Sequence, residues 1–347
     1  MHLPFVIAEI GVNFYDTASV KGISPLEAAK EYILQAKKAG VNAVKFQSYK
    51  AETIASKNSP AYWDTTKEPT LSQYELFKKF DSFNKNDYEE LALFCKEVDV
   101  MFLSTPFDYE SADYLNNLCG IFKISSSDLS NLPFLRYIAK KGKPIFLSVG
   151  AAYLSEVDEA VRVLQAENCT DIVLLHCVLS YPTLNKNANL ATITALKKAF
   201  PNVRIGYSDH TLPDENMQVL STAYLLGAEV IEKHFTLDKS LKGNDHYHAG
   251  DPSDFKKAID NFKLIKEIIG TEEKTVLPCE EIPRREARRS LVLNKSVKSG
   301  QIIKSKDLVA KRPGTGISPK YQHIIEGKKI NKNLPEDTVL KWDDFLI

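Results

Sequence analysis

The sequence lacks the features that mark membrane proteins, nucleic-acid-binding proteins and disulfide-rich secreted proteins. Its 347 residues carry 45 Lys and Arg against 45 Asp and Glu, so the net charge favours neither a nucleic acid nor a membrane as a partner. The first residues, MHLPFVIAEIGVNF, have no basic leader and no apolar run long enough to span a bilayer. The five cysteines are scattered without a CxxC pair, which is typical of reduced thiols. We therefore expect a cytoplasmic protein.

Several common motifs are also missing. No GxGxxG turn follows the first apolar run, which disfavours an open, doubly wound nucleotide-binding sheet. No Ser/His/Asp triad can be assembled from Ser208, Asp209 and His210, because contiguous side chains point in different directions. Cys177 has apolar neighbours, which favour a buried thiol over a nucleophile.

Short apolar runs alternate with amphipathic stretches over most of the chain, which is the pattern of a parallel β/α protein. The predicted strands are 5–10, 43–47, 100–105, 121–125, 144–149, 171–176, 203–208 and 229–235. Helical patterns lie between and after them, at 25–40, 84–98, 154–168, 215–227 and 252–270. Eight strands in about 250 residues predict a (β/α)₈ TIM barrel of the α/β class, with an open sheet as the alternative.

The pattern changes towards the C-terminus. We predict a barrel domain at 1–270, a linker at 271–289 and a small β-rich domain at 290–347, with strands at 290–297, 307–313 and 338–345. From Arg284 onward the chain has 15 Lys and Arg against 7 Asp and Glu, whereas the preceding residues have 30 against 38. This basic tail could dock on its acidic neighbour, meet an anionic substrate or bind nucleic acid. One long insertion, 49–82, is expected to form a lid or rim over the barrel mouth.

Polar residues follow or end almost every predicted strand, where barrel enzymes hold their catalytic groups. They are Glu9 and Asn13; Lys45 and Gln47; Ser104 and Thr105; Lys123, Ser125 and Ser126; Ser148; His176; Ser208, Asp209 and His210; and Glu232 and His234. A barrel with no function at its mouth would not need the complete ring.

The two lysines and the hydroxyl groups of this ring suit a phosphate. Lysine supplies charge, while Ser and Thr hydroxyls complete the hydrogen bonds of the phosphate oxygens. The alternative is that Lys45 and Lys123 pair with Glu9 and Glu232 as structural ion pairs inside the barrel.

His210 and His234 end neighbouring strands, which lie about 4.8 Å apart in a sheet. Both imidazoles could therefore reach one divalent metal ion that keeps open positions as a Lewis acid. The alternative is a pair of hydrogen-bonded histidines near the core. His246 and His248, in GNDHYHAG, could add ligands, although such loop pairs are often only solvated.

Several segments together resemble the sialic acid synthase (NeuB-type) family along essentially the whole chain. They are AEIGVN (8–13), VKFQ (44–47), STPFD (104–108), KISSSDLSNLP (123–133), GKPIFLSVG (142–150), LLHCVLSYP (174–182), GYSDHT (206–211), IEKHFT (231–236) and KRPGTGISP (311–319). The small C-terminal domain looks like the antifreeze-like (SAF) domain of that family. The resemblance implies condensation of phosphoenolpyruvate with an N-acyl amino sugar to a nine-carbon 2-keto acid. It also implies a TIM barrel, a Mn²⁺ or Mg²⁺ ion and a domain-swapped homodimer.

The resemblance also implies roles for individual residues. It assigns His210 and His234 to the metal and to catalysis, together with Glu9 and Asp245 near the sugar and the metal-bound water. Phosphoenolpyruvate is expected to contact Lys45, Thr105, Lys123, Ser126, Ser148 and Ser208. The sugar is expected to contact Gln47, Tyr181 and Arg312, with Arg312 supplied by the partner subunit.

Some positions depart from the family pattern and leave the sugar open. Leu179 stands where some members have Asn or Ser, Ala249 stands where Ser is common, and the composition of the 49–82 insertion is unusual. The sugar is expected to be N-acetylmannosamine or a related deoxy-diacetamido hexose. The alternatives are a synthase acting on a shorter phosphorylated sugar and a non-catalytic sugar-binding protein. A Schiff-base lyase would not require the histidine pair.

Overall fold

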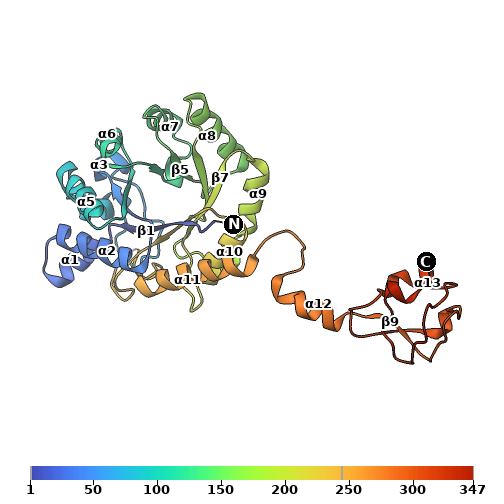
Figure 1. Ribbon diagram of the computed structural model, residues 1–347. Helices are drawn as coiled ribbons and strands as arrows, with labels where there is room; N and C mark the ends of the chain where they lie inside the picture. Colours follow the sequence, from blue (N-terminus) through green and yellow to red (C-terminus); the bar gives the residue numbers. More distant parts are fainter. Residues whose placement is uncertain (1, 244, 347) are drawn as a thin grey trace. The chain divides into compact units, whose positions relative to one another are not determined.

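The computed structural model describes residues 2–243 and 245–346, so the outer ends of the predicted domains, residues 1 and 347, lie outside the described residues. The chain divides into two compact units, of which the first ends at Gly270 and the second begins at Thr271 (Figure 1).

The first unit contains an eight-stranded parallel sheet surrounded by helices (Figure 1). The strands are β1 (Phe5–Gly11), β2 (Ala43–Ser48), β3 (Met101–Pro106), β4 (Phe122–Ile124), β5 (Ile145–Ser148), β6 (Ile172–His176), β7 (Arg204–Asp209) and β8 (Val230–His234). Their order is β3-β2-β1-β8-β7-β6-β5-β4, and β3 contacts β4 to complete the ring. The predicted TIM barrel is confirmed, and each strand lies within one residue of its predicted bounds.

The helices of this unit are α1 (Phe14–Lys21), α2 (Pro25–Ala39), α3 (Ala51–Ile54), α4 (Gln73–Lys79), α5 (Lys85–Glu97), α6 (Tyr109–Leu118), α7 (Leu132–Ala139), α8 (Leu154–Ala166), α9 (Ala191–Ala199), α10 (Gln218–Leu225) and α11 (Pro252–Ile269). Short 3₁₀ turns lie at Ser126–Asp128 and Asn185–Asn187. Helix α10 begins three residues later than predicted. The Asp214 carboxylate accepts the N–H groups of Asn216 and Gln218 and so stabilises a turn there instead.

Two apolar layers hold the barrel together. The larger one fills the space between strands and helices. The smaller one lies inside the barrel and consists of Ile7, Ala43, Leu103, Phe146, Val173, Leu175 and Val230. Because side chains on one face of a strand recur every second residue, the residue two positions after each of these also points inward, nearer the carboxyl ends of the strands. Those positions include Glu9, Lys45 and Glu232, so the sequence alternates an apolar floor with a polar layer above it.

The predicted insertion, 49–82, is an ordered part of the barrel unit. It contains α3, α4 and a bridge between Pro60 and Ser72. The indole of Trp63 is buried and donates its N–H to the Glu68 carbonyl at 3.0 Å. The Thr53 hydroxyl donates to the Asp108 carboxylate at 2.7 Å and Tyr49 packs edge-on against Phe107, which holds the segment beside the carboxyl ends of the strands.

The second unit is a small β-containing domain with its own apolar core. It contains η3 (Pro278–Glu280), α12 (Glu281–Ala287), β9 (Ser290–Leu293), η4 (Ser305–Asp307), β10 (Leu308–Lys311), η5 (Pro319–Tyr321), α13 (Gln322–Ile325) and η6 (Trp342–Asp344). Strands β9 and β10 pair antiparallel.

Several details of this unit differ from the prediction. The strands predicted at 290–297 and 307–313 are shorter, as β9 and β10. The stretch predicted as a linker, 271–289, contains η3 and the exposed helix α12, and the carbonyl of Arg285 accepts the N–H of Gly314 at 2.7 Å. The strand predicted at 338–345 is reduced to isolated bridges at Val339 and Phe345, because η6 interrupts it.

No helix in the described part of the chain is long and apolar enough to cross a membrane. All five cysteines are free thiols, and only Cys279 is exposed.

Candidate active site

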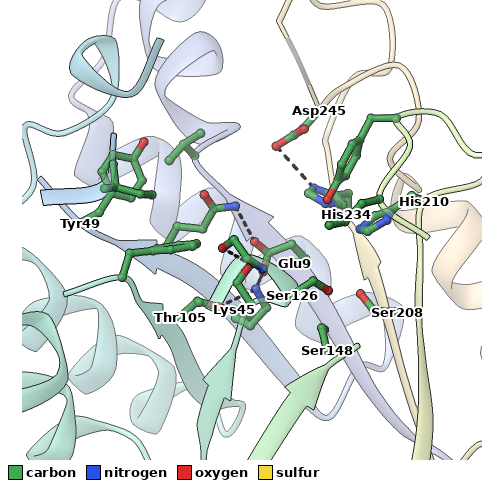
Figure 2. A pocket seen from close by; sticks show the side chains of 18 of the residues that line it. Glu9, Lys45, Tyr49, Thr105, Ser126, Ser148, Ser208, His210, His234 and Asp245 are labelled. Carbon is green, nitrogen blue, oxygen red and sulfur yellow. Dashed lines mark hydrogen bonds and ion pairs between the residues drawn. The ribbon is translucent and has the colours of Figure 1, made fainter. Parts of the chain in front are cut away.

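A cavity of about 450 Å³ opens at the carboxyl ends of the barrel strands. Every predicted site residue of the barrel lines it: Glu9, Lys45, Gln47, Thr105, Lys123, Ser126, Ser148, Tyr181, Ser208, His210, His234 and Asp245. Figure 2 shows Glu9, Lys45, Thr105, Ser148, Ser208 and His234 on neighbouring strands around one space, with Ser126, His210 and Asp245 beside them. The polar strand ends therefore form one site.

Strand register brings the charged residues together. On β1, Glu9 lies opposite Lys45 of β2 and His234 of β8, and on β7 Ser208 lies opposite Glu232 of β8. In a parallel sheet, side chains at matched positions point to the same face. One inward-facing layer therefore holds cations, carboxylates and an imidazole.

Four buried groups, Glu9, Lys45, Lys123 and Glu232, form what we call the lysine cluster. Lys45 forms an ion pair with Glu9 and donates to the Thr105 hydroxyl at 3.1 Å. The Lys123 ammonium lies 3.6 Å from the Glu232 carboxylate. The ion pairs considered as an alternative are therefore present. They leave two ammonium groups at the cavity wall, each also facing a hydroxyl.

Hydroxyl groups surround Lys123. Its ammonium group donates to the Ser148 hydroxyl at 2.7 Å, and the Ser208 hydroxyl donates to Glu232 at 3.0 Å. The Ser126 hydroxyl accepts the N–H of Gly150 at 2.9 Å. These donors and hydroxyls fit the oxygens of a phosphate or carboxylate ligand.

Burial and charge shift the pKa values of this cluster. Burial raises the pKa of Glu9 and lowers that of Lys123. Burial also disfavours the charged form of Glu232, but Lys123 and Lys45 outweigh it and hold the Glu232 pKa below its usual value. The charges thus compensate one another, so an arriving anion meets ammonium groups that are already desolvated and oriented.

A second group, the histidine cluster, consists of His210, His234, Asp245 and His248. The ring centroids of His210 and His234 are 5.4 Å apart, and those of His234 and His248 are 4.9 Å apart. Tyr181 lies against three of these rings, with its ring centroid 4.3 Å from that of His210. Figure 2 shows Asp245 reaching towards His234, and Nδ1 of His234 lies 3.6 Å from the carboxylate.

The histidine cluster suits a divalent metal. His210 Nδ1 bonds to the Val178 carbonyl at 2.8 Å, which leaves Nε2 as the free acceptor. Burial lowers the pKa of His210 to about 4 and that of His234 well below its usual value, so both rings are neutral, as a metal requires. Among the described residues, Nδ1 of His234 and both ring nitrogens of His248 are buried without a hydrogen-bond partner.

The tightest potential metal-binding group differs from the predicted pair. Ligand atoms of His234, Asp245 and His248 lie within 4.8 Å of one another, whereas His210 flanks this group. His246, by contrast, is fully used by the fold, because Thr236 and Asp16 bind its two nitrogens at 2.7 and 3.2 Å. The assignment of His210 and His234 to a metal stays a prediction.

Other polar strand ends have structural roles. His176 is bonded to the Ala188 carbonyl at 2.9 Å and stacks on Tyr207. Asp209 points away from the cavity and forms a buried ion pair with Lys233 at 2.6 Å. Neither His176 nor Asp209 lines the cavity.

Sequence reasoning missed part of the site. Glu232 was considered only as a structural ion-pair partner, although it also lines the cavity and faces both lysines. The 49–82 segment, predicted to form a lid or rim, supplies an apolar wall of the cavity whose residues were not singled out: Tyr49, Ile54, Tyr62, Leu76, Phe77 and Phe80. Its aromatic content was the available sign, but no spacing rule connects that segment to the strand ends.

Arg312, predicted to reach a neighbouring subunit's sugar, lies in the second unit directly after β10 and is exposed. The geometry of the barrel cavity therefore does not test the role predicted for Arg312.

Comparison with known proteins agrees with this geometry. The NeuB family model matches residues 32–274, and the SAF domain model matches residues 288–346. The chain is 41% identical to an uncharacterized protein of Methanocaldococcus jannaschii, over 99% of this chain and 94% of that protein. It is 38% identical to the N,N'-diacetyllegionaminic acid synthase of Campylobacter jejuni, over 98% and 100%.

A solved structure is similar as well. The N-acetylneuraminic acid synthetase of Leptospira borgpetersenii, in complex with citrate, matches with a TM-score of 0.70 and 31% identity, over 81% of this chain and 90% of that chain. The chain is therefore an enzyme of the NeuB family, among the nonulosonic acid synthases, and carries a C-terminal SAF domain.

Proposed function

We propose that this enzyme condenses phosphoenolpyruvate with the open-chain form of an N-acyl amino sugar and water, giving a nine-carbon 2-keto acid and phosphate. A carbon–carbon bond forms between C3 of phosphoenolpyruvate and the sugar aldehyde carbon. Water adds at C2, and the bond between C2 and the bridging oxygen breaks, so that oxygen leaves with the phosphate.

The lysine cluster beside the histidine cluster, in one cavity, is the observation that supports this reaction most directly. Phosphoenolpyruvate carries a phosphate and a carboxylate, and Lys45 and Lys123 offer two desolvated ammonium groups with hydroxyls beside them. The names of the relatives support a nonulosonic acid as the product.

Each residue has a role that follows from its position. The leaving phosphate is held by Lys123, Ser148 and Ser126. The other anionic oxygens of phosphoenolpyruvate are held by Lys45 and Thr105. Glu9 and Asp245 are carboxylates on the cavity wall that could take the proton of the attacking water and stabilise positive charge at C2. Gln47 donates to Glu9 at 3.0 Å and so orients that carboxylate.

His210 and His234 would hold the divalent ion. When bound, Mn²⁺ or Mg²⁺ supplies a Lewis acid that polarises the aldehyde oxygen. Tyr181 packs against both rings and limits their rotation.

The test is phosphate release from phosphoenolpyruvate across a panel of hexosamine derivatives in Mn²⁺, with and without EDTA. Phosphoenolpyruvate labelled with ¹⁸O at the bridging position should release labelled phosphate. Lys123→Met should lower kcat/KM for phosphoenolpyruvate at least about 100-fold, because a desolvated charge contact is lost. The control is the exposed Lys140→Met. If no sugar triggers phosphate release, the proposal is wrong.

We further propose that the sugar carries more than one methyl-bearing substituent, as in a deoxy-diacetamido hexose. The apolar wall supports this, because Tyr49 packs edge-on against Phe77 with ring centroids 5.3 Å apart and leaves an aromatic surface facing the cavity. A hydroxyl placed against such a surface loses its hydrogen bonds to water, whereas a methyl group gains burial.

The expected outcome is a higher kcat/KM for a 2,4-diacetamido-2,4,6-trideoxy hexose than for N-acetylmannosamine. Phe77→Ala should shrink that ratio about 10-fold, since one apolar contact of this size is worth about 1–3 kcal/mol. Leu93→Ala, on the exposed face of α5, serves as the control. Equal kcat/KM values for the two sugars would contradict this choice of substrate while leaving the condensation intact.

A further inference from the structure

His248 lies in the histidine cluster because of the way the loop after β8 returns to the barrel. The N–H of Gly250 donates to the His234 carbonyl at 2.8 Å, and the N–H of Thr236 donates to the Gly250 carbonyl at 3.0 Å. Phe235 and Gly250 thereby form a parallel bridge, which places His248 beside the last residue of β8. The His248 side chain is fully buried there.

Within residues 2–243 and 245–346, the ring of His248 finds no hydrogen-bond partner. Among the described residues, it is the one histidine whose two ring nitrogens are both buried and unpaired. A neutral imidazole always carries one N–H, and burying an unpaired polar group is destabilising. His246, two residues earlier and equally buried, has a partner at each nitrogen. The lack of a partner at both ring nitrogens is therefore a property of the His248 position and not of the loop as a whole.

The unpaired nitrogens face suitable ligand atoms. His248 Nε2 lies 3.9 Å from Asp245 Oδ1, and His234 Nδ1 lies 3.6 Å from Asp245 Oδ2. Both distances exceed a hydrogen bond. Two ligands of one ion with bonds near 2.1 Å lie roughly 3.0–3.4 Å apart, so a small contraction would place all three donors around a common ion.

We propose that His248 is a further protein ligand of the enzyme's divalent ion, added to His210 and His234 on the side where Asp245 approaches. This inference takes one premise from the proposed function, namely that the enzyme uses a divalent metal ion. Three imidazoles beside one carboxylate favour Mn²⁺, Fe²⁺, Co²⁺ or Zn²⁺ over Mg²⁺, which prefers oxygen ligands. Residue 248 thus sets which metal the site accepts.

Metal binding by the full chain tests the proposal without a turnover assay. Titration calorimetry of metal-free protein with Mn²⁺ and with Zn²⁺ should show one tight site per chain. His248→Ala should weaken Mn²⁺ and Zn²⁺ at least about 100-fold, since even outer-shell changes around a metal cost 10–100-fold. The affinity for Mg²⁺ should fall much less. His246→Gln, the matched control from the same loop, should keep the Mn²⁺ affinity of the unaltered protein within a few-fold.

A second measurement covers the case in which His248→Ala does not fold. In the unaltered protein, ¹⁵N spectra of the histidine rings should show a large shift of one His248 nitrogen on addition of Zn²⁺. An unchanged Mn²⁺ and Zn²⁺ isotherm in folded His248→Ala, or a His248 resonance that Zn²⁺ does not move, overturns the proposal. Neither result depends on phosphate release, so failure here and failure of the proposed reaction are distinguishable.

Discussion

Asp209 and Lys233 form an ion pair that is almost completely buried beside the active-site strands β7 and β8. Tyr207 and Thr211 also donate hydrogen bonds to the Asp209 carboxylate, at 2.9 and 3.1 Å. Burial disfavours the ionised carboxylate, but Lys233 and these hydrogen bonds outweigh it and hold the Asp209 pKa below its usual value. The pair therefore fixes the carboxyl ends of two strands that carry His210 and His234.

Asp209→Asn should reduce the free energy of unfolding by about 3–5 kcal/mol, because it leaves the buried ammonium of Lys233 without a compensating charge. Urea denaturation measures this loss. The matched control is Asp171→Asn, which breaks the half-exposed pair with Arg204 and should cost less than about 1 kcal/mol. Equal losses in the two variants would contradict a specific role for burial.

The part of the candidate site that lies on or directly after the strands could be predicted from the sequence, because side chains alternate between the two faces of a strand. Because inward residues alternate, Ser208 and His210 could be placed at the barrel mouth without a structure. The partner of Asp209 could not, since Lys233 is distant in sequence and its role depends on strand register. The isolation of His248 was equally hidden, because it follows from where the loop after β8 bends back.

At the scale of elements, helix α11 shows why local sequence predicted its start well. The side chain of Asp251 accepts the N–H groups of Ser253 and Asp254, at 2.8 and 3.0 Å, and Pro252 occupies the first helical position. Lys239 adds an ion pair to Asp251 at 2.7 Å. The residues of this cap are adjacent in sequence, so the start of α11 could be predicted. The start of α10 instead depends on the turn at Asp214. The position of 49–82 depends on contacts with the barrel.

The cap of α11 predicts a pH dependence of stability. Burial raises the pKa of Asp251, but Lys239 and Ser253 outweigh it and lower this pKa to about 2. A carboxyl with a depressed folded-state pKa stabilises the fold above its unfolded pKa, near 3.9, and loses that contribution as pH falls towards the folded value. The stability difference between the unaltered protein and Asp251→Asn should therefore be constant above about pH 5 and close between pH 4 and pH 2. Urea midpoints at each pH measure it, and a difference that stays constant down to pH 2 would contradict the assignment.

At the scale of the whole molecule, charge separates the two units. Acidic residues are in excess up to residue 283 and basic residues from Arg284 onward. Opposite net charges favour docking between a barrel and a C-terminal domain, within one chain or between two. The predicted domain-swapped dimer, with Arg312 acting on the partner's sugar, is consistent with this separation and stays a prediction.

A mixing experiment tests it. Arg312→Ala should fold and dimerise normally but lose most activity, as should Lys123→Met for a different reason. If Arg312 acts across the dimer, subunit exchange between the two variants creates one intact site in each mixed dimer and restores roughly a quarter of the original activity. No recovery in mixtures shown to contain mixed dimers would mean that Arg312 serves its own chain or none.

The apolar floor of Ile7, Ala43, Leu103, Phe146, Val173, Leu175 and Val230 closes the barrel directly beneath the polar layer. Ligands therefore enter and leave the cavity on the same side. Lys45 and Lys123 lie in the layer next to this floor, and the residues of the apolar wall line the same cavity. If the enzyme condenses an anion with a sugar as proposed, we expect ordered binding, with the anion entering before the sugar and phosphate leaving after the sugar product.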